Sequence, residues 1–300
     1  MRDLVDIDAE LVSRYDTAGP RYTSYPTAAQ FHAGFGEARY RERAERTNRD
    51  VPARPLSLYF HLPFCPNICF YCACNKVITK NRARIAPYLE RLSKEIALQG
   101  ALFDRARRVE QLHWGGGTPT FLSHEQMRAL MHITREHFQL RDDDRGDYGV
   151  EVDPRQADAA TIGLLRELGF NRISMGVQDF DPVVQAAVNR IQSEQQTFAV
   201  WEAARLEGFH SINVDLIYGL PHQTVASFGR TLDKIVAAGP DRLSVFNYAH
   251  LPALFPPQRR IDGAALPGPL EKLGILKLTI ARLIDAVYVY IGMDHFARAD

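Results

Sequence analysis

The sequence predicts an α/β protein, a partial, open (β/α) barrel of six to seven parallel strands with an N-terminal arm. Short apolar segments alternate with amphipathic segments of helical periodicity from residue 56 onward, and this repetition is typical of a parallel sheet. Polar side chains recur where the strands end, which is where (β/α) barrels place their functional residues. Six or seven strand–helix units fall short of the eight that close a barrel, so we expect an open one.

The expected strands are short apolar runs rich in β-branched and aromatic residues. Parallel strands end at the same edge of a sheet, so the polar residues that follow them should meet at one rim. The strands are residues 56–62, 110–115, 148–153, 172–178, 211–217, 242–248 and, as a seventh, 287–293. The polar groups at their ends are Cys65, residues 115–118, Glu151, Asp153, Gln178, Asp215 and Asn247.

The expected helices lie between these strands. The second begins with a capping box formed by Ser123 and Gln126. The helices are near residues 84–99, 124–138, 157–168, 195–207, 225–238 and 270–285. Glycines follow four of them, where a left-handed C-cap is favoured: Gly100, Gly169, Gly208 and Gly239.

Residues 1–55 differ from the rest of the chain. They are rich in Arg and Tyr and include a charged stretch at 38–46, which indicates a solvated helix. For residues 1–15 a disordered arm is an equally supported alternative. The Pro- and Tyr-rich residues 19–26 predict an ordered strap across a site. We therefore divide the chain into an N-terminal arm and strap, 1–55, and a barrel, 56–300.

Composition limits the partners and the compartment. With 36 basic and 36 acidic residues the formal net charge is zero, which argues against nucleic acid or a membrane bound through bulk charge. No run approaches the ~18 apolar residues of a membrane span, and acids occupy the N-terminus where a secretory signal needs an apolar core. Clustered cysteines without an export signal indicate the cytoplasm. We expect a cytoplasmic monomer.

All four cysteines lie within ten residues, directly after the first expected strand: Cys65, Cys69, Cys72 and Cys74. Thiolates so close together favour a metal over disulfides. The first three have the spacing CxxxCxxC, and three ligands on one loop can hold three irons of a 4Fe–4S cubane. The fourth iron then stays open, whereas an electron-transfer cluster normally takes four cysteines. The expected metal ligands are Cys65, Cys69 and Cys72.

A structural zinc site and a disulfide pair are the alternatives. Zinc knuckles usually supply two cysteine pairs that are well apart in sequence. Because Cys74 is only two residues beyond Cys72, a tetrahedral site using all four thiols would strain the loop. We leave Cys74 outside the ligand set, with its role open.

Residues 113–119 end the second strand and contain three consecutive glycines. Such a run lets a backbone approach a ligand closely and can offer N–H groups to it, although alone it is more often a tight turn. Glu151 and Asp153 flank Val152 and so face the same side of their strand. Acids on a barrel rim need cations or hydroxyls as partners; acids that end a strand at the surface are the alternative.

The CxxxCxxC loop resembles the signature of radical S-adenosylmethionine enzymes, in which the open iron binds the amino and carboxylate groups of S-adenosylmethionine. Further motifs extend the resemblance over essentially the whole chain, and they are similar to those of the oxygen-independent coproporphyrinogen III oxidase family. They are residues 19–26, 58–65, 74–77, 174–180, 189–190, 213–221, 247–252 and 292–296.

The resemblance implies one 4Fe–4S cluster on Cys65, Cys69 and Cys72 and two S-adenosylmethionine molecules per chain. The positions that match contacts of the cluster-bound molecule are Tyr59, Gly116 and Glu151. Those that match contacts of the second are Tyr71, Gly117, Thr118, Gln178, Arg190, Asp215 and Ala249.

The resemblance also implies an oxidoreductase of anaerobic haem and porphyrin biosynthesis. An electron donor reduces the cluster, and cleavage of S-adenosylmethionine gives a 5′-deoxyadenosyl radical that abstracts a hydrogen from a propionate of coproporphyrinogen III. Loss of CO₂ and one electron leaves a vinyl group, and two such events give protoporphyrinogen IX. Candidate cations for the substrate carboxylates are Arg21, Arg259 and Arg260; the sequence determines neither a catalytic side chain nor the final electron acceptor.

This chain departs from the family in two ways. Family members continue into a mostly helical C-terminal domain, so a chain that stops at Asp300 is expected to be a fragment or a truncated form. Val287 stands where the family's helix-to-strand turn usually has Gly. A β-branched residue is poorly suited to a left-handed cap, so we expect a distorted turn there.

Two rival functions remain. The nearer is a haem-binding chaperone of a related radical S-adenosylmethionine lineage, which generally has an aromatic residue in place of Cys74 and lacks the arm at 19–26. The more distant is a non-catalytic, zinc-stapled α/β protein. Iron and sulfide analysis separates the zinc protein from the other two.

Overall fold

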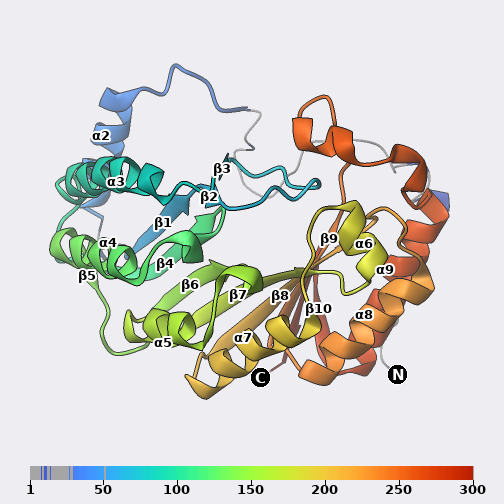
Figure 1. Ribbon diagram of the computed structural model, residues 1–300. Coiled ribbons are helices and arrows are strands. Elements are labelled where there is room, and N and C mark those ends of the chain that lie inside the picture. The colour runs from blue at the N-terminus through green and yellow to red at the C-terminus, as the bar shows by residue number, and fades with distance from the viewer. Residues whose placement is uncertain are drawn as a thin grey trace.

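Six parallel strands form most of one large sheet that curves without closing, as the sequence predicted (Figure 1). The computed structural model describes residues 8, 10, 11, 14, 27, 30–50 and 52–299. The expected strap at 19–26, with Arg21, lies outside these residues. In spatial order the six strands are β1 (Leu56–Leu62), β4 (Arg108–Gly116), β6 (Asp147–Val152), β7 (Arg172–Gln178), β8 (Ser211–Tyr218) and β9 (Arg242–Asn247).

The seventh expected strand does not extend this parallel set directly. It forms β10 (Tyr288–Gly292), and the chain turns back at once into β11 (His295–Arg298), which pairs antiparallel with both β9 and β10. Gly292 and Met293 have positive φ and make this tight turn. The sequence analysis missed β11 because a four-residue strand has too little alternation to be recognised. A short strand, β5 (Gln139–Leu140), pairs with the start of β4.

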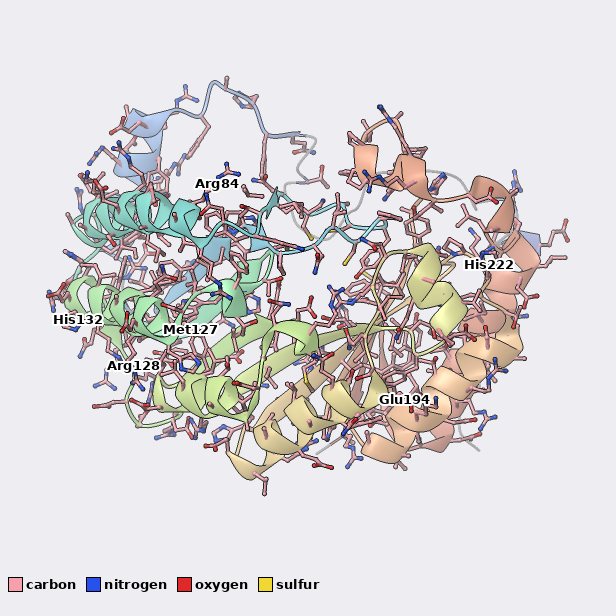
Figure 2. The ribbon with its side chains drawn as sticks, viewed as in Figure 1. Arg84, Met127, Arg128, His132, Glu194 and His222 are labelled. Atoms are coloured by element: carbon pink, nitrogen blue, oxygen red, sulfur yellow. The ribbon has the colours of Figure 1, made fainter. Side chains whose placement is uncertain are left out.

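The helices cover the convex face of the sheet (Figure 1). On α4, Met127 is buried, whereas the side chains of Arg128 and His132 are about half and three quarters exposed (Figure 2). The six expected helices are present as α3 (Ile85–Gly100), α4 (His124–His137), α5 (Ala159–Glu167), α7 (Glu194–Leu206), α8 (Val225–Ala238) and α9 (Pro269–Asp285). The sequence analysis missed the short α6 (Pro182–Ala187), and the charged stretch at 38–46 forms the mostly exposed α2 (Glu37–Thr47). No helix in the described part of the chain is long and apolar enough to cross a membrane.

The capping predictions hold except at one glycine. The capping box of Ser123 and Gln126 is formed, and the other three expected cap glycines have φ values of 67° to 102°. Gly100 was predicted wrongly, because it is the last residue of α3 and right-handed backbone continues at Ala101. A Cβ on Gly100 would lie 2.8 Å from the Cβ of His137. The glycine there allows α3 to approach the end of α4 closely.

The core lies between the sheet and the helices, and the concave face of the sheet is polar. Trp114, Val150 and Met175 on the convex face are each fully buried. A closed barrel of this class fills its interior with bulky branched side chains. Here the inward positions hold mostly small or polar residues, among them Ser57, Gln111, Gly149, Ser174, Asn213 and Ser244. The open barrel therefore has a cavity lined largely by polar residues rather than a packed centre.

The turn between α9 and β10 is formed with Val287 itself in the left-handed region, at φ 63°. Its N–H donates to the carbonyl of Ile284 at 3.0 Å, and its side chain is 67% exposed. The turn is therefore made with a β-branched residue in the left-handed conformation, which is the strain that we expected at Val287.

Val287→Gly is expected to stabilise the fold. Left-handed backbone costs a non-glycine residue roughly 1–2 kcal/mol, while glycine adds about 0.4–1 kcal/mol of unfolded-state entropy. We expect a net gain of about 0.5–1 kcal/mol from these two terms, measured as a higher denaturant midpoint. Val289→Gly, at an exposed position inside β10, is the matched control and should lower that midpoint. Equal losses in both variants would contradict the assignment of strain to Val287.

Candidate cofactor site

Groups from five strands meet at the C-terminal edge of the sheet. Leu62 at the end of β1 pairs with Gly116 at the end of β4, and Gly176 of β7 pairs with Asp215 of β8. Gly116 N–H in turn donates to Glu151 of β6 at 3.1 Å. The expected rim is therefore present on one edge of the sheet, with the cysteine loop following β1.

The cysteine loop is closed by a small two-stranded sheet. Cys65 lies in β2 (Phe64–Cys65), which pairs in parallel with β3 (Val77–Ile78). Cys69 is buried and Cys74 is exposed, and all four thiols are free. The segment after α6 fixes the loop from the other side, since Asn189 Nδ2 donates to the carbonyl of Ile68 at 2.7 Å.

Each cysteine of the expected ligand set has different neighbours. Cys65 Sγ lies 3.4 Å from Thr118 Oγ1, and Cys69 Sγ accepts N–H groups from two arginines. Cys72 is hydrogen-bonded by the thiol of Cys74, and this bond lowers the pKa of Cys72 to about 6 and raises that of Cys74. The ammonium of Lys76 also lowers the pKa of Cys72.

The donor set fits an iron–sulfur cluster better than a single zinc ion. No three Cys, His, Asp or Glu side chains of the described residues are grouped closely enough for one metal ion. Zinc holds thiolates at about 2.3 Å, so their sulfurs would converge within about 4 Å of one another. A cubane binds each thiolate at a separate iron, so its ligand sulfurs stand further apart around a loop.

Two arginines and one carboxylate surround Cys69. Arg155 Nη2 and Arg190 Nη1 each lie 3.6 Å from Cys69 Sγ. Asp153 Oδ2 pairs with the same two groups, at 2.7 Å and 3.3 Å respectively. Burial acts to raise the pKa of Asp153, but Arg190 and Arg155 outweigh it and hold that pKa below its usual value. Arg190 was among the positions that the family resemblance implied, whereas Arg155 was not predicted. The sequence feature that could have indicated Arg155 is its place in the turn that Asp153 caps.

Glu151 is held by the backbone of the glycine run and by a histidine. One carboxylate oxygen of Glu151 accepts from the Gly116 N–H, and the other lies 3.3 Å from His113 Nε2. The His113 ring stacks on Tyr59, with ring centroids 5.8 Å apart. Tyr59 Oη lies 3.0 Å from His61 Nδ1, and His61 Nε2 lies 2.8 Å from the carbonyl of Asn75. Because a carbonyl only accepts, His61 donates from Nε2 and accepts from Tyr59. Tyr59 and Glu151 are thus brought together and linked to the cysteine loop; the sequence analysis missed both histidines.

The glycine run serves close packing rather than N–H donation to a ligand, which corrects the expectation from the sequence. Gly117 N–H donates to the Leu62 carbonyl and Thr118 N–H to the Phe64 carbonyl, each at 2.9 Å, and Gly116 N–H is used by Glu151. Instead, a Cβ on Gly117 would lie 2.7 Å from the backbone of Pro63. The absence of side chains lets β4 touch the cysteine loop.

Gly117→Ala is expected to displace the cysteine loop, because the new methyl would meet backbone atoms that cannot rotate away. The overpacking should cost about 1–3 kcal/mol and lower the iron content after reconstitution. Gly263→Ala is the control, since nothing lies within 4 Å of a Cβ there. Full iron loading with unchanged stability in Gly117→Ala would contradict the close contact.

Asp215 lies in a separate polar network on β7, β8 and β9. It accepts from Ser174 Oγ and from Asn213 Nδ2, each at 2.8 Å, and Asn213 also contacts Ser244. Burial raises the pKa of Asp215, and the charge of Glu151 adds to the rise against the effect of the Ser174 bond. Glu151 and Asp215 therefore lie on different strands but near enough for the charge of one to act on the other.

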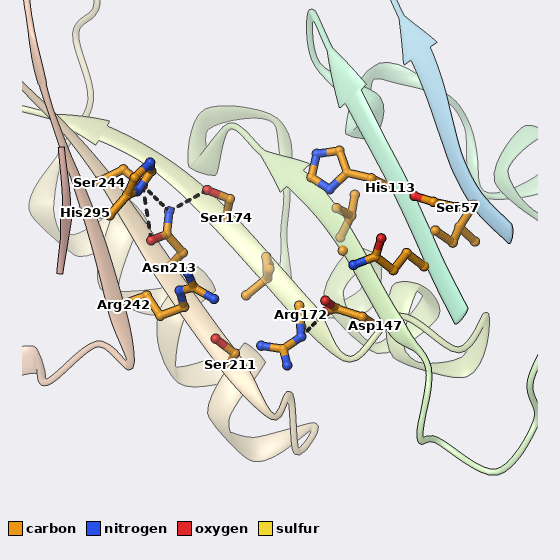
Figure 3. A pocket seen from close by; sticks show the side chains of 15 residues that line it. Ser57, His113, Asp147, Arg172, Ser174, Ser211, Asn213, Arg242, Ser244 and His295 are labelled. Carbon is orange, nitrogen blue, oxygen red and sulfur yellow. Dashed lines mark hydrogen bonds and ion pairs between the residues drawn. The ribbon is translucent and has the colours of Figure 1, made fainter. Parts of the chain in front are cut away.

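A cavity of about 360 Å³ lies on the concave face toward the N-terminal ends of the strands, where Asp147, Arg172 and Ser211 begin β6, β7 and β8. Figure 3 shows His113 on one side of it and Ser174, Asn213 and Ser244 on the other. These side chains contact Glu151 on the first side and the network of Asp215 on the second. The two carboxylates are thus supported from beneath by the polar wall of the barrel.

Two buried polar atoms at the rim have no hydrogen-bond partner among the described residues, Gln178 Oε1 and Arg190 Nε. Gln178 also has a positive φ of 69°, which is strained for a non-glycine residue. Buried polar atoms are normally satisfied, so these atoms fit a place where a ligand supplies the missing partners.

The remaining expected residues lie where the cysteine loop meets the segment after β9. Gln258 Nε2 donates to the carbonyls of Tyr71 and Ala249, at 3.1 Å and 3.2 Å. Arg260 lies over the ring of Phe70 at 5.2 Å, and Arg259 donates to the carbonyl of Pro252. The sequence analysis missed Gln258, which ties the two segments together.

The structure has a curved parallel sheet with the cysteine loop at its C-terminal edge. This arrangement defines its class: an open barrel that can bear an iron–sulfur cluster. Residues 59–235, more than half of the chain, match the sequence model of the Radical SAM superfamily. The chain belongs to that superfamily.

Its relatives narrow the comparison. The chain is 60% identical to the oxygen-independent coproporphyrinogen III oxidase of Pseudomonas aeruginosa over 300 residues, which is all of this chain and 65% of that protein. It is 50% identical to the Escherichia coli protein of the same name, covering 99% of this chain and 63% of the relative. The solved structure of the Escherichia coli coproporphyrinogen III oxidase, described as a radical SAM enzyme, superimposes with a TM-score of 0.91 at 48% identity, covering 99% of this chain and 65% of that one. The chain thus spans about 65% of the length of the relatives it matches.

Proposed function

We propose that this chain is the barrel-bearing part of an oxygen-independent coproporphyrinogen III oxidase. The proposed reaction is the oxidative decarboxylation of two propionates of coproporphyrinogen III to vinyl groups, giving protoporphyrinogen IX. The observation that carries the proposal is 60% identity to a protein of that name across all 300 residues. The arm at 1–55 and the barrel at 56–300 are its proposed units.

In this proposal Cys65, Cys69 and Cys72 hold the 4Fe–4S cluster, with its fourth iron open to S-adenosylmethionine. The bound cluster and S-adenosylmethionine supply the radical that removes a hydrogen from the substrate. Tyr59, Gly116 and Glu151 orient the cluster-bound molecule. Gly116 and Glu151 are already joined, because the Gly116 N–H donates to the Glu151 carboxylate.

A second S-adenosylmethionine is proposed beside the first, at the rim formed by β7 and β8. The unpartnered atoms of Gln178 and Arg190 and the prearranged carboxylate of Asp215 support it. The full set is Tyr71, Gly117, Thr118, Gln178, Arg190, Asp215 and Ala249. Because their N–H groups are used within the protein, Gly117 and Thr118 would contact this ligand through other atoms.

The substrate carboxylates and the partners complete the proposal. Arg259 and Arg260 lie exposed beside the cysteine loop and are the proposed cations for the substrate. The cluster takes one electron at a time from a donor. The clustered free thiols fit a reducing compartment, the cytoplasm, and we propose a monomer without nucleic-acid or membrane partners.

The test is anaerobic incubation of the reconstituted chain with coproporphyrinogen III, S-adenosylmethionine and a chemical reductant. Chromatography of the oxidised porphyrins should show divinyl product, and 5′-deoxyadenosine should accumulate with it. The Cys72→Ala variant is the control and should give neither. Tight haem binding with neither product would instead favour the haem-chaperone function.

A further inference from the structure

Two guanidinium groups converge on a single sulfur in this protein. Arg155, in the turn after β6, and Arg190, in the loop after α6, each place an N–H nitrogen 3.6 Å from Cys69 Sγ. Cys65 has the Thr118 hydroxyl as its neighbour, and Cys72 has the Cys74 thiol and the ammonium of Lys76. Among the residues described, Cys69 therefore differs from its two companions in receiving N–H groups from two guanidiniums.

Both guanidiniums are fixed in place. Asp153 accepts from Arg155 through Nε at 3.0 Å and Nη2 at 2.7 Å, and it also caps the backbone N–H of Arg155 at 3.0 Å. Arg190 donates its other terminal nitrogen to the carbonyl of Gly176 at 2.5 Å. The side chains of Arg155, Asp153 and Arg190 are only 14%, 9% and 8% exposed. The donors are thus rigid and largely shielded from water.

The charges of this group do not cancel. Two guanidiniums carry two positive charges, and Asp153 supplies one negative charge to both. A buried cation without a counter-ion is costly. A cysteine that ligates iron is an anionic sulfur, so Cys69 in its ligated form supplies the missing negative charge.

We propose that Arg155 and Arg190 act through Cys69 to raise the reduction potential of the iron–sulfur cluster. Reduction adds one electron to the cluster, and hydrogen bonds to its sulfurs and nearby positive charge stabilise that added charge. The electron comes from the one-electron donor of the proposed function, and no bond is made or broken. Arg155 is a positioning residue that acts through Cys69. The inference rests on the proposed cluster at Cys65, Cys69 and Cys72.

Arg155→Gln tests the proposal without touching the expected S-adenosylmethionine ligands. The variant and the unmutated chain are reconstituted anaerobically and titrated electrochemically, with the reduced cluster followed by electron paramagnetic resonance. We expect the midpoint potential of Arg155→Gln to fall by an amount equal to about a tenfold weaker reduction, roughly 59 mV for one electron. Arg155→Lys keeps the positive charge but loses the planar set of N–H donors of the guanidinium. Its midpoint potential should therefore fall by less than that of Arg155→Gln.

Two further variants control for general charge and for folding. Arg82→Gln removes one positive charge near the loop, where Arg82 donates to the carbonyl of Phe121, a residue whose ring stacks on Phe64 of β2. We expect it to lower the potential less than Arg155→Gln does. Asp153→Asn removes the counter-ion while leaving two donors, so its potential should rise. This opposite sign provides a test even if Arg155→Gln binds no cluster.

Three results would overturn the inference: unchanged potentials in Arg155→Gln and Asp153→Asn with full iron content, a fall in both, or an equal fall in Arg82→Gln and Arg155→Gln. Each leaves the proposed function intact, since the cluster is present. Failure of the unmutated chain to take up about four irons with the absorbance of a 4Fe–4S cluster is a different result. It would instead remove the proposed function.

Discussion

Replacing Cys65, Cys69 or Cys72 by Ala is expected to abolish the iron–sulfur absorbance of the anaerobically reconstituted chain, while Cys74→Ala keeps it. Three thiolates on one loop are the minimum that holds a cubane with one open iron, so losing one ligand releases the cluster. Cys74 is exposed, and its thiol is hydrogen-bonded to that of Cys72. Its loss removes support for a ligand but not a ligand.

Iron and acid-labile sulfide analysis of the four variants checks this result, with circular dichroism to establish that each is folded. The four substitutions are matched, since each removes one thiol from the same ten-residue stretch. Loss of the cluster in Cys74→Ala, with the fold retained, would refute the three-ligand assignment. Retention of a complete cluster in Cys69→Ala would refute it as well.

Glu151→Ala and Asp215→Ala are expected to affect different S-adenosylmethionine molecules. The two carboxylates lie on different strands and are held by different groups, Gly116 and His113 for the first and Ser174 and Asn213 for the second. A charge-assisted hydrogen bond to a ligand contributes about 1.5–3 kcal/mol, or roughly ten- to a hundredfold in affinity. Asp215→Ala should weaken one class of site by that factor and leave reductive cleavage largely intact. Glu151→Ala should impair cleavage.

Equilibrium binding of S-adenosylmethionine and release of 5′-deoxyadenosine measure the two effects separately. Glu207→Ala is a suitable control, because Glu207 lies on the helical side near Gly163 and away from the rim. One binding site per unmutated chain, or the same defect in both variants, would contradict a two-cofactor cavity.

The strands and helices were predictable because burial on one face imposes a period on the sequence. The predicted strand at 172–178 has the bounds of β7, and the capping box at Ser123 is formed as expected. Prediction failed where tertiary packing decided the local structure. Gly100 serves contact with His137 rather than a left-handed cap, and β11 exists because β9 offers it an edge.

The candidate site divides in the same way. The sequence by itself determined the three-cysteine loop and the rim acids, because ligand spacing on one loop and the end of a strand are local properties. Only the tertiary structure decided the contacts among them. Arg155 and Arg190 lie 86 and 121 residues from the cysteine that both contact. The N–H groups of the glycine run were expected to face a ligand, but Gly117 and Thr118 donate to carbonyls of β1 and β2 and Gly116 donates to Glu151. Hydrogen bonds between distant segments depend on how the sheet curves, and no pattern of neighbouring residues records that curvature.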